Sequence, residues 1–179
     1  MNKYNIWDPL LRVFHWTLVA GFAANALLLE DDGSAHQVVG YIILGLLVFR
    51  LAWGFVGSRY ARFSSFIPTA RAVRGQISDM ATGRARVHLG HTPLGALMIW
   101  NIIATLLAIS ATGYLLTISA YSGAEWVEEA HEALVIWAEI SVVAHILAVI
   151  WESLRTGVNL PRAMVTGVKT VPAKATIVE

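Results

Sequence analysis

The chain of 179 residues is 56% hydrophobic and 14% charged, whereas soluble domains carry about 25% charged residues. This composition predicts an integral membrane protein, and the net charge of +1 gives no reason to expect a nucleic-acid partner. The chain has no cysteine, which excludes disulfides, cysteine-ligated iron–sulfur clusters, thiolate zinc sites and covalent haem attachment through C-x-x-C-H.

The first part of the chain holds two apolar segments, each near the ~20 residues that cross the hydrocarbon core of a bilayer. The first covers roughly residues 10–29. It contains Ala24-Asn25-Ala26, which looks like a signal-peptide cleavage site, but the apolar run continues beyond it, so we expect a retained span. An acidic turn at Glu30, Asp31 and Asp32 leads into the second span, roughly residues 36–56.

Residues 57–90 form the longest polar connection, an arginine-rich segment that we expect to be a basic cytoplasmic loop. Pro68 could open a short helix within it, with Val73, Ile77 and Met80 on one face, as in helices that lie at a membrane surface. A plain solvated loop is the alternative.

Two further spans complete the expected single domain of residues 1–179. The third covers roughly residues 92–118 and the fourth roughly residues 130–154, with an acidic connection between them at Glu125, Glu128 and Glu129. Residues 155–179 are expected to form a cytoplasmic tail. The predicted fold class is therefore all-α, an integral membrane four-helix bundle.

The distribution of charge predicts the orientation of the four spans. If the N-terminus is inside, all 13 lysines and arginines lie at the N-terminus, in the 57–90 loop, in the tail or, for Arg50, at the inner end of the second span. The two outer connections contain only acidic charges. Because cytoplasmic segments of membrane proteins are enriched in lysine and arginine, we expect the N-in, C-in topology.

Four histidines lie within or at the ends of these spans. His131 and His145 are fourteen residues apart on the fourth span, which is roughly 21 Å of helix on nearly one face. With the predicted orientation, His15 shares the inner depth with His145, and His36 shares the outer depth with His131. Two facing histidines at one depth suit bis-imidazole ligation of the iron of a flat macrocycle. Buried, hydrogen-bonded histidines are the alternative for each position.

Two glycines and two arginines near these histidines have either a cofactor-binding role or an ordinary structural one. Gly21 and Gly40 lie near His15 and His36, where glycine either leaves room for a porphyrin edge or allows close helix packing. Arg12 and Arg50 lie at the inner interface, where a guanidinium pairs with haem propionates or serves as an ordinary flanking charge.

Three other ionisable residues are not expected to bind iron. His91, at the entrance of the third span, is expected to form interfacial hydrogen bonds, and His88 is expected to be solvated. Glu139 lies in the middle of the fourth span, so it must find a buried partner or be protonated. No catalytic residue is assigned.

The motifs in the chain resemble the bacterial cytochrome b561 family, which includes the cytochrome b subunits of nickel–iron hydrogenases. The opening Trp7-Asp8-Pro9-Leu10-Leu11-Arg12-Val13-Phe14-His15-Trp16 is similar to the family's D-P-x-x-R-x-F-H-W pattern. Four further family-like motifs follow in the family's order: His36-Gln37-Val38-Val39-Gly40-Tyr41, Arg50-Leu51-Ala52-Trp53-Gly54-Phe55-Val56-Gly57-Ser58-Arg59-Tyr60-Ala61-Arg62-Phe63, Gly90-His91-Thr92-Pro93-Leu94-Gly95-Ala96 and His131-Glu132-Ala133-Leu134.

The resemblance covers essentially the whole chain and implies two non-covalent haems b, held at the positions of His15, His36, His131 and His145. It implies a multi-pass protein of the bacterial inner membrane that exchanges electrons between the quinone pool and a periplasmic redox protein such as a c-type cytochrome. The alternatives are oxidation of superoxide coupled to quinone reduction, service as a hydrogenase cytochrome b subunit, and a non-redox scaffold or metal-ion transporter.

Overall fold

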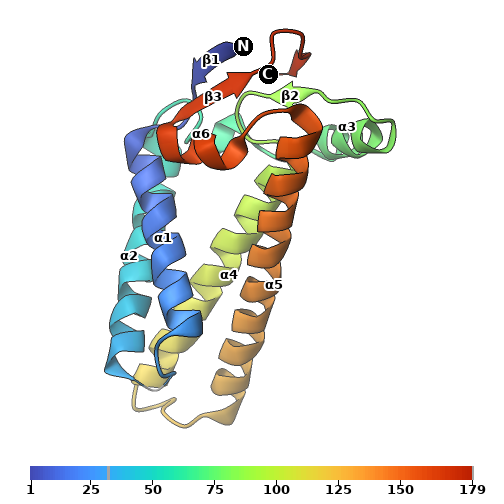
Figure 1. Cartoon of the computed structure of the whole chain (residues 1–179). Coiled ribbons are helices and arrows are strands. Elements are labelled where there is room, and N and C mark those ends of the chain that lie inside the picture. The colour runs from blue at the N-terminus through green and yellow to red at the C-terminus, as the bar shows by residue number, and fades with distance from the viewer. Residues whose placement is uncertain (32, 179) are drawn as a thin grey trace. The chain divides into compact units, whose positions relative to one another are not determined.

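The computed structural model describes residues 1–31 and 33–178, so Asp32 of the predicted acidic turn lies outside the described residues. Four long apolar helices, each able to cross a membrane by length and composition, dominate the fold (Figure 1): α1 (Pro9–Leu27), α2 (Ser34–Val56), α4 (Pro93–Thr117) and α5 (Glu125–Thr156). These helices confirm the predicted all-α class and its four candidate spans. The N-in orientation stays a prediction.

Helix α5 begins earlier than expected, at Glu125 instead of near residue 130. Glu125 and Glu128 both lie in its first turn, where negative charge interacts favourably with the unpaired N–H groups of a helix. The acidic residues expected in a connection therefore form the first turns of α5.

The shorter elements lie before, between and after the long helices. They are β1 (Asn2–Asn5), the 3-10 helix η1 (Phe63–Ser65), α3 (Ala70–Ala81), β2 (Val87–His88), α6 (Leu160–Thr166), β3 (Val168–Val171) and β4 (Ile177–Val178). The chain divides into two compact units. The first contains residues 1–12, 52–99 and the described residues from 143 onward, and the second contains residues 13–51 and 100–142.

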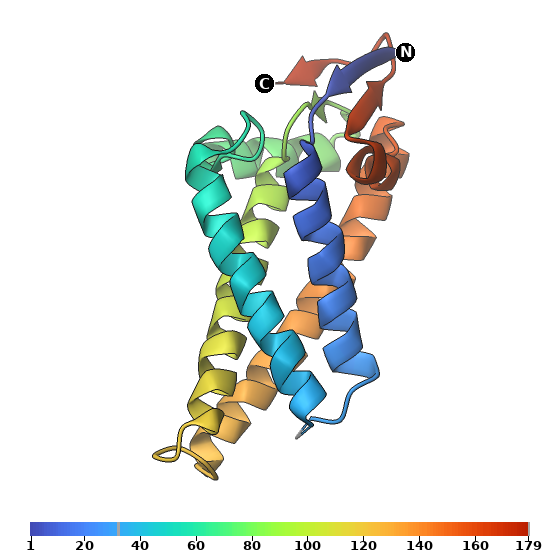
Figure 2. The same cartoon turned by 90° about the vertical axis from the view of Figure 1, so that its left-hand side faces the viewer.

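The second unit is a bundle of segments from all four long helices. Its core contains Ile43 and Leu47 of α2 and Leu106 of α4, and Leu47 is fully buried. In Figures 1 and 2, α1 and α2 lie side by side. The ring of Phe14 on α1 lies 6.4 Å from that of Phe49 on α2, measured between ring centres.

Polar side chains also join helices in the second unit. Asn101 of α4 donates to the hydroxyl of Ser141 on α5 at 2.8 Å, and its carbonyl oxygen accepts from the indole of Trp137 at 3.1 Å. A satisfied polar cluster of this kind links two helices in an apolar environment, where an unpaired polar group is costly.

The first unit brings segments from distant parts of the chain together through two small sheets. Strand β1 pairs antiparallel with β3, from Asn2 opposite Val171 to Asn5 opposite Val168, and β2 pairs in parallel with β4. The apolar core between them consists of Ile6, Val87, Leu89, Val158 and Val171.

Gly167 ends α6 in a left-handed conformation, with φ of 81°. A Cβ at this position would lie 2.7 Å from the carbonyl oxygen of Trp7, so glycine is required sterically as well. The carbonyl oxygen of Gly167 accepts from the N–H groups of Ile6 and Trp7, which continues the connection between the two chain ends.

The basic connection contains a helix, α3, so the first of the two alternatives considered for this segment, a short helix, is the one that forms. Thr69 caps it by accepting from the N–H of Ala72. Its buried residues are Gln76 and Asp79, whereas Ile77 is 51% exposed. Helix α3 therefore packs against the rest of the first unit through a polar face, and Ile77 lies at the surface.

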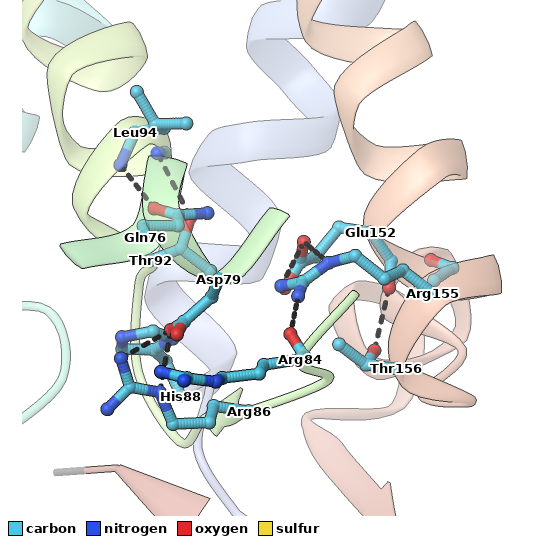
Figure 3. A network of polar contacts seen from close by, with 12 residues as sticks. Gln76, Asp79, Arg84, Arg86, His88, Thr92, Leu94, Glu152, Arg155 and Thr156 are labelled. Carbon is cyan, nitrogen blue, oxygen red and sulfur yellow. Dashed lines mark hydrogen bonds and ion pairs between the residues drawn. The ribbon is translucent and has the colours of Figure 1, made fainter. Parts of the chain in front are cut away.

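A polar network holds α3 and its neighbours (Figure 3). Gln76 accepts from the N–H of Leu94 at 2.8 Å, and Asp79 accepts from the guanidinium of Arg86 at 2.6 Å. Arg155 donates to both carboxylate oxygens of Glu152 and to the carbonyl oxygen of Arg84. The arginines of the predicted basic loop are thus partly used for internal contacts.

Lys169 is the central polar group of the first unit. It is 2% exposed, and its ammonium group donates to the carbonyl oxygens of His88, Leu89 and Gly90 at 2.9, 2.7 and 3.1 Å. Burial lowers the pKa of Lys169 to about 8, against the opposing effect of Glu152. The three bonds fix the segment between β2 and α4 to strand β3.

Asp8 caps α1 and connects it to the segment after α2. One carboxylate oxygen accepts from the N–H of Leu11 at 2.9 Å, and the other accepts from Ser58 at 2.6 Å and from Trp53 at 3.4 Å. Burial raises the pKa of Asp8, but these hydrogen bonds outweigh it and hold the pKa below its usual range.

We expect Asp8→Ala to lower the free energy of unfolding by about 1–2 kcal/mol, because the helix cap is lost. The native pKa is lowered, so the contribution of the ionised carboxylate is complete above the unfolded-state pKa and is lost as the pH falls through the native pKa. Thermal unfolding in detergent between about pH 2 and 5 measures both effects. A wild-type pH dependence in Asp8→Ala would contradict the assignment.

We expect Lys169→Met to destabilise the first unit by roughly 1–3 kcal/mol, because three buried or partly buried carbonyl groups lose their donor. Limited proteolysis of the segment 87–91, followed by mass spectrometry, measures the local loosening. Lys174→Met is the matched control, since Lys174 is exposed. Equal protection in the two variants would show that Lys169 does not hold this segment.

Candidate functional site

His36 and His131 approach each other in the second unit. His36 is near the start of α2 and His131 is in the second turn of α5. Their ring centres are 6.4 Å apart, and the ring planes are inclined at 62°. The two histidines that the sequence paired at the outer depth are therefore neighbours.

The backbone near His36 is held by the preceding helix. The side-chain amide of Asn25 on α1 donates to the carbonyl oxygen of His36 at 3.3 Å. Among the described residues, no hydrogen-bond partner reaches the buried Nδ1 atom of the His36 ring. A histidine ring in an apolar helix that is not used for hydrogen bonds to the described residues is suited to serve as a metal ligand.

His131 is held by two consecutive residues of α4. The hydroxyl oxygen of Thr112 lies 2.9 Å from Nδ1 of His131, and it lies 3.0 Å from the carbonyl oxygens of Ala108 and Ile109. A Cβ at Gly113 would lie 3.1 Å from Cε1 of His131, so the ring packs directly on the backbone of α4.

The sequence analysis did not identify Thr112 and Gly113. The available signal was a threonine followed by a glycine in the middle of an otherwise apolar span. That signal is weak, because threonine in a membrane helix commonly bonds to its own backbone and glycine commonly permits helix packing.

The separation of the two rings fits ligation of one metal ion. An imidazole nitrogen binds a first-row metal ion at about 2.0–2.1 Å, which places the centres of two opposed rings about 6.3 Å apart. The observed separation of 6.4 Å, with the ring planes inclined at 62°, is close to that value. No cluster of three or more histidine, aspartate or glutamate side chains that could hold a metal ion occurs within residues 1–31 and 33–178. The donor set is thus two neutral imidazoles, which suits haem iron.

The two glycines proposed for a porphyrin edge have different surroundings. No described heavy atom lies within 4 Å of a Cβ built at Gly40, one turn after His36. A Cβ at Gly21 would make ordinary contacts with Val39 and Ile43 at 3.6 and 3.4 Å. Open space is present beside Gly40, whereas Gly21 lies against α2. Binding of a cofactor at either position stays a prediction.

His15 and His145 lie in different units, His15 on α1 in the second unit and His145 on α5 in the first. The ring of His15 meets that of Trp16 edge-on, with centres 5.0 Å apart. His145 is partly buried. Their pairing at the inner depth stays a prediction.

Arg12 and Arg50 are both placed on the long helices. Arg12 donates to the carbonyl oxygen of Val165 at 2.6 Å, and it lines an open cavity of about 440 Å³ together with Asp8 and Arg59. Arg50, on α2, is only 2% exposed. Pairing of either guanidinium with haem propionates stays a prediction.

The other two histidines lie in the first unit, away from the predicted ligands in sequence. The ring of His91 lies 4.6 Å from that of Trp7 and 4.4 Å from that of Phe66, so it packs within an aromatic cluster. His88 is partly buried in β2. Burial lowers the pKa of His88, against the opposing effect of Glu152.

Glu139 is exposed on α5, and no hydrogen bond or ion pair to it occurs among the residues that the structure describes. The sequence left two possibilities for this carboxyl group, a buried partner or protonation. Within the described chain the first does not occur, and the side chain lies at the surface of α5.

Comparison with known proteins identifies the family. The family model described as prokaryotic cytochrome b561 matches residues 6–167, which includes all four long helices and the four paired histidines. No curated protein and no solved structure matches the chain. The chain therefore belongs to the prokaryotic cytochrome b561 family, whose members are membrane cytochromes b that carry haem b and take part in electron transfer.

Proposed function

We propose that this protein holds two haems b and carries electrons across the bacterial inner membrane, between the quinone pool and a periplasmic redox protein such as a c-type cytochrome. His36 and His131 hold the outer haem and His15 and His145 hold the inner one. The observation that carries the proposal is the approach of the His36 and His131 rings at 6.4 Å.

The residues around the first pair support binding of a haem. His36 and His131 supply one neutral imidazole each, and haem iron bound between them would supply a one-electron ferric–ferrous couple. Gly40 leaves open space one turn from His36. His36 and His131 are both partly buried on apolar helices, and solvent exposure is one of the factors that set the potential of a haem.

The second pair is proposed from the sequence. His131 and His145 lie on the same continuous helix, α5, with roughly 21 Å of helical rise between them. Two ligands so spaced would place one iron in each half of the bilayer. This arrangement gives an electron two successive sites across the membrane.

The outer connections support a basic protein as the periplasmic partner. Five of the six carboxylates assigned to that side belong to the described residues, and all five are exposed: Glu30, Asp31, Glu125, Glu128 and Glu129. A surface of one sign steers the encounter with a partner of the opposite sign, with a smaller effect on affinity. The same charges repel superoxide, so they favour the electron carrier over superoxide oxidation.

Removal of one ligand tests the haem assignment. We expect the wild-type protein to contain two haems b per chain and His131→Ala or His36→Ala to contain one, because each substitution removes a ligand of the outer iron. A pyridine haemochrome assay on purified protein measures the content. His88→Ala is the control and should retain two haems. No haem in the wild type, or two in both ligand variants, would contradict the proposal.

Neutralisation of the acidic connection tests the partner. We expect the combined change of Glu125, Glu128 and Glu129 to Gln to slow electron exchange with a basic c-type cytochrome about tenfold or more at low salt. The difference should vanish near 1 M salt, where the screening length is only about 3 Å. Stopped-flow measurements give the rate, with an acidic cytochrome as control. Equal slowing with both cytochromes would exclude electrostatic steering.

A further inference from the structure

We propose that Thr112 is a positioning residue for His131: its hydroxyl oxygen accepts the Nδ1 proton of the ring and leaves Nε2 as the iron-binding nitrogen. The inference rests on the proposed function, because it takes His131 as a haem ligand. It adds a residue on a third helix, α4, that controls the orientation and the electron donation of that ligand.

The hydrogen-bond geometry of Thr112 determines the direction of the bond. A hydroxyl has one proton, and carbonyl oxygens can only accept. The hydroxyl oxygen of Thr112 lies 3.0 Å from the carbonyl oxygens of Ala108 and Ile109, so its proton is directed toward them. If the hydroxyl donated to His131 instead, its oxygen would lie 3.0 Å from each of the two carbonyl oxygens with no proton between them, which is unfavourable.

The imidazole must therefore be the donor in the contact of 2.9 Å between Thr112 and Nδ1 of His131. A neutral imidazole carries one proton, so a protonated Nδ1 leaves Nε2 with a free lone pair. Iron-binding histidines commonly donate the other ring N–H in this way, which fixes both the tautomer and the ring orientation.

Gly113 restricts the same ring sterically. A Cβ at this position would lie 3.1 Å from Cε1 and 3.6 Å from Nδ1 of His131, closer than most real side-chain contacts at the first of these atoms. The Nδ1–Cε1 edge of the ring is thus held by the hydroxyl of Thr112 and by the backbone at Gly113, two consecutive residues of α4. Glycine here allows the hydrogen bond of Thr112 to form.

The two ligands of the outer site differ in this respect. Nδ1 of His36 is buried and has no hydrogen-bond partner among the described residues, whereas Nδ1 of His131 has Thr112. Control of electron donation through a hydrogen bond is therefore concentrated on the His131 side. An acceptor at Nδ1 raises the basicity of the ligand, which favours ferric iron and lowers the reduction potential.

Substitution of Thr112 separates this role from simple packing. Thr112→Val keeps the shape of the side chain and removes the acceptor, so the potential of one haem should rise by about 59 mV, a tenfold change for one electron. Thr112→Ser keeps the acceptor and should retain the wild-type potential. Thr105→Val is the matched control, since Thr105 is also buried on α4 and shares no described hydrogen bond with a histidine.

Redox titration of purified protein, followed at the haem absorption bands, measures both potentials. An unchanged potential in Thr112→Val, or an equal rise in Thr105→Val, would overturn the inference. If Thr112→Val retains one haem only, Thr112→Ser decides: wild-type haem content supports the inference, and the same loss in both variants overturns it. Two haems in His131→Ala would overturn the proposed function itself, whatever the Thr112 variants show.

Discussion

Every polar group on a membrane-spanning helix must be satisfied without water, and this constraint organises the second unit. Asn101, Ser141 and Trp137 satisfy one another between α4 and α5. The same two helices bring Thr112 to His131, while His36 retains a buried nitrogen that no described residue satisfies. The polar groups of this bundle thus separate into those that join helices and the ring of His36, which we propose as a haem ligand.

The first unit is stabilised differently, because it combines a small apolar core with buried charged side chains. Lys169 remains acceptable in the interior because three carbonyl groups surround its ammonium group. Asp79 and Glu152 are paired with Arg86 and Arg155. These contacts make the residues between the spans an ordered unit instead of a set of independent loops.

The sequence predicted the large features of the fold because they follow from long-range composition. Apolar runs of the right length predicted α1, α2, α4 and α5. The depths assigned to the spans paired His36 with His131, whose ring centres lie 6.4 Å apart, and their role as ligands stays a prediction. The strands were not predicted, because β1 and β3 have four residues each and pair across the length of the chain. Thr112 was missed for a similar reason: its role depends on the rotation of α4 relative to α5, and a span that is apolar all round carries no signal for rotation.

The pairing of β1 with β3 has a consequence for biosynthesis. Residues 2–5 leave the ribosome long before residues 168–171, which form the strand that completes their ladder. All four long helices are made between these two events. The amino-terminal strand can therefore complete its ladder only after every long helix has been synthesised, so the first unit is the last part of the chain to finish folding.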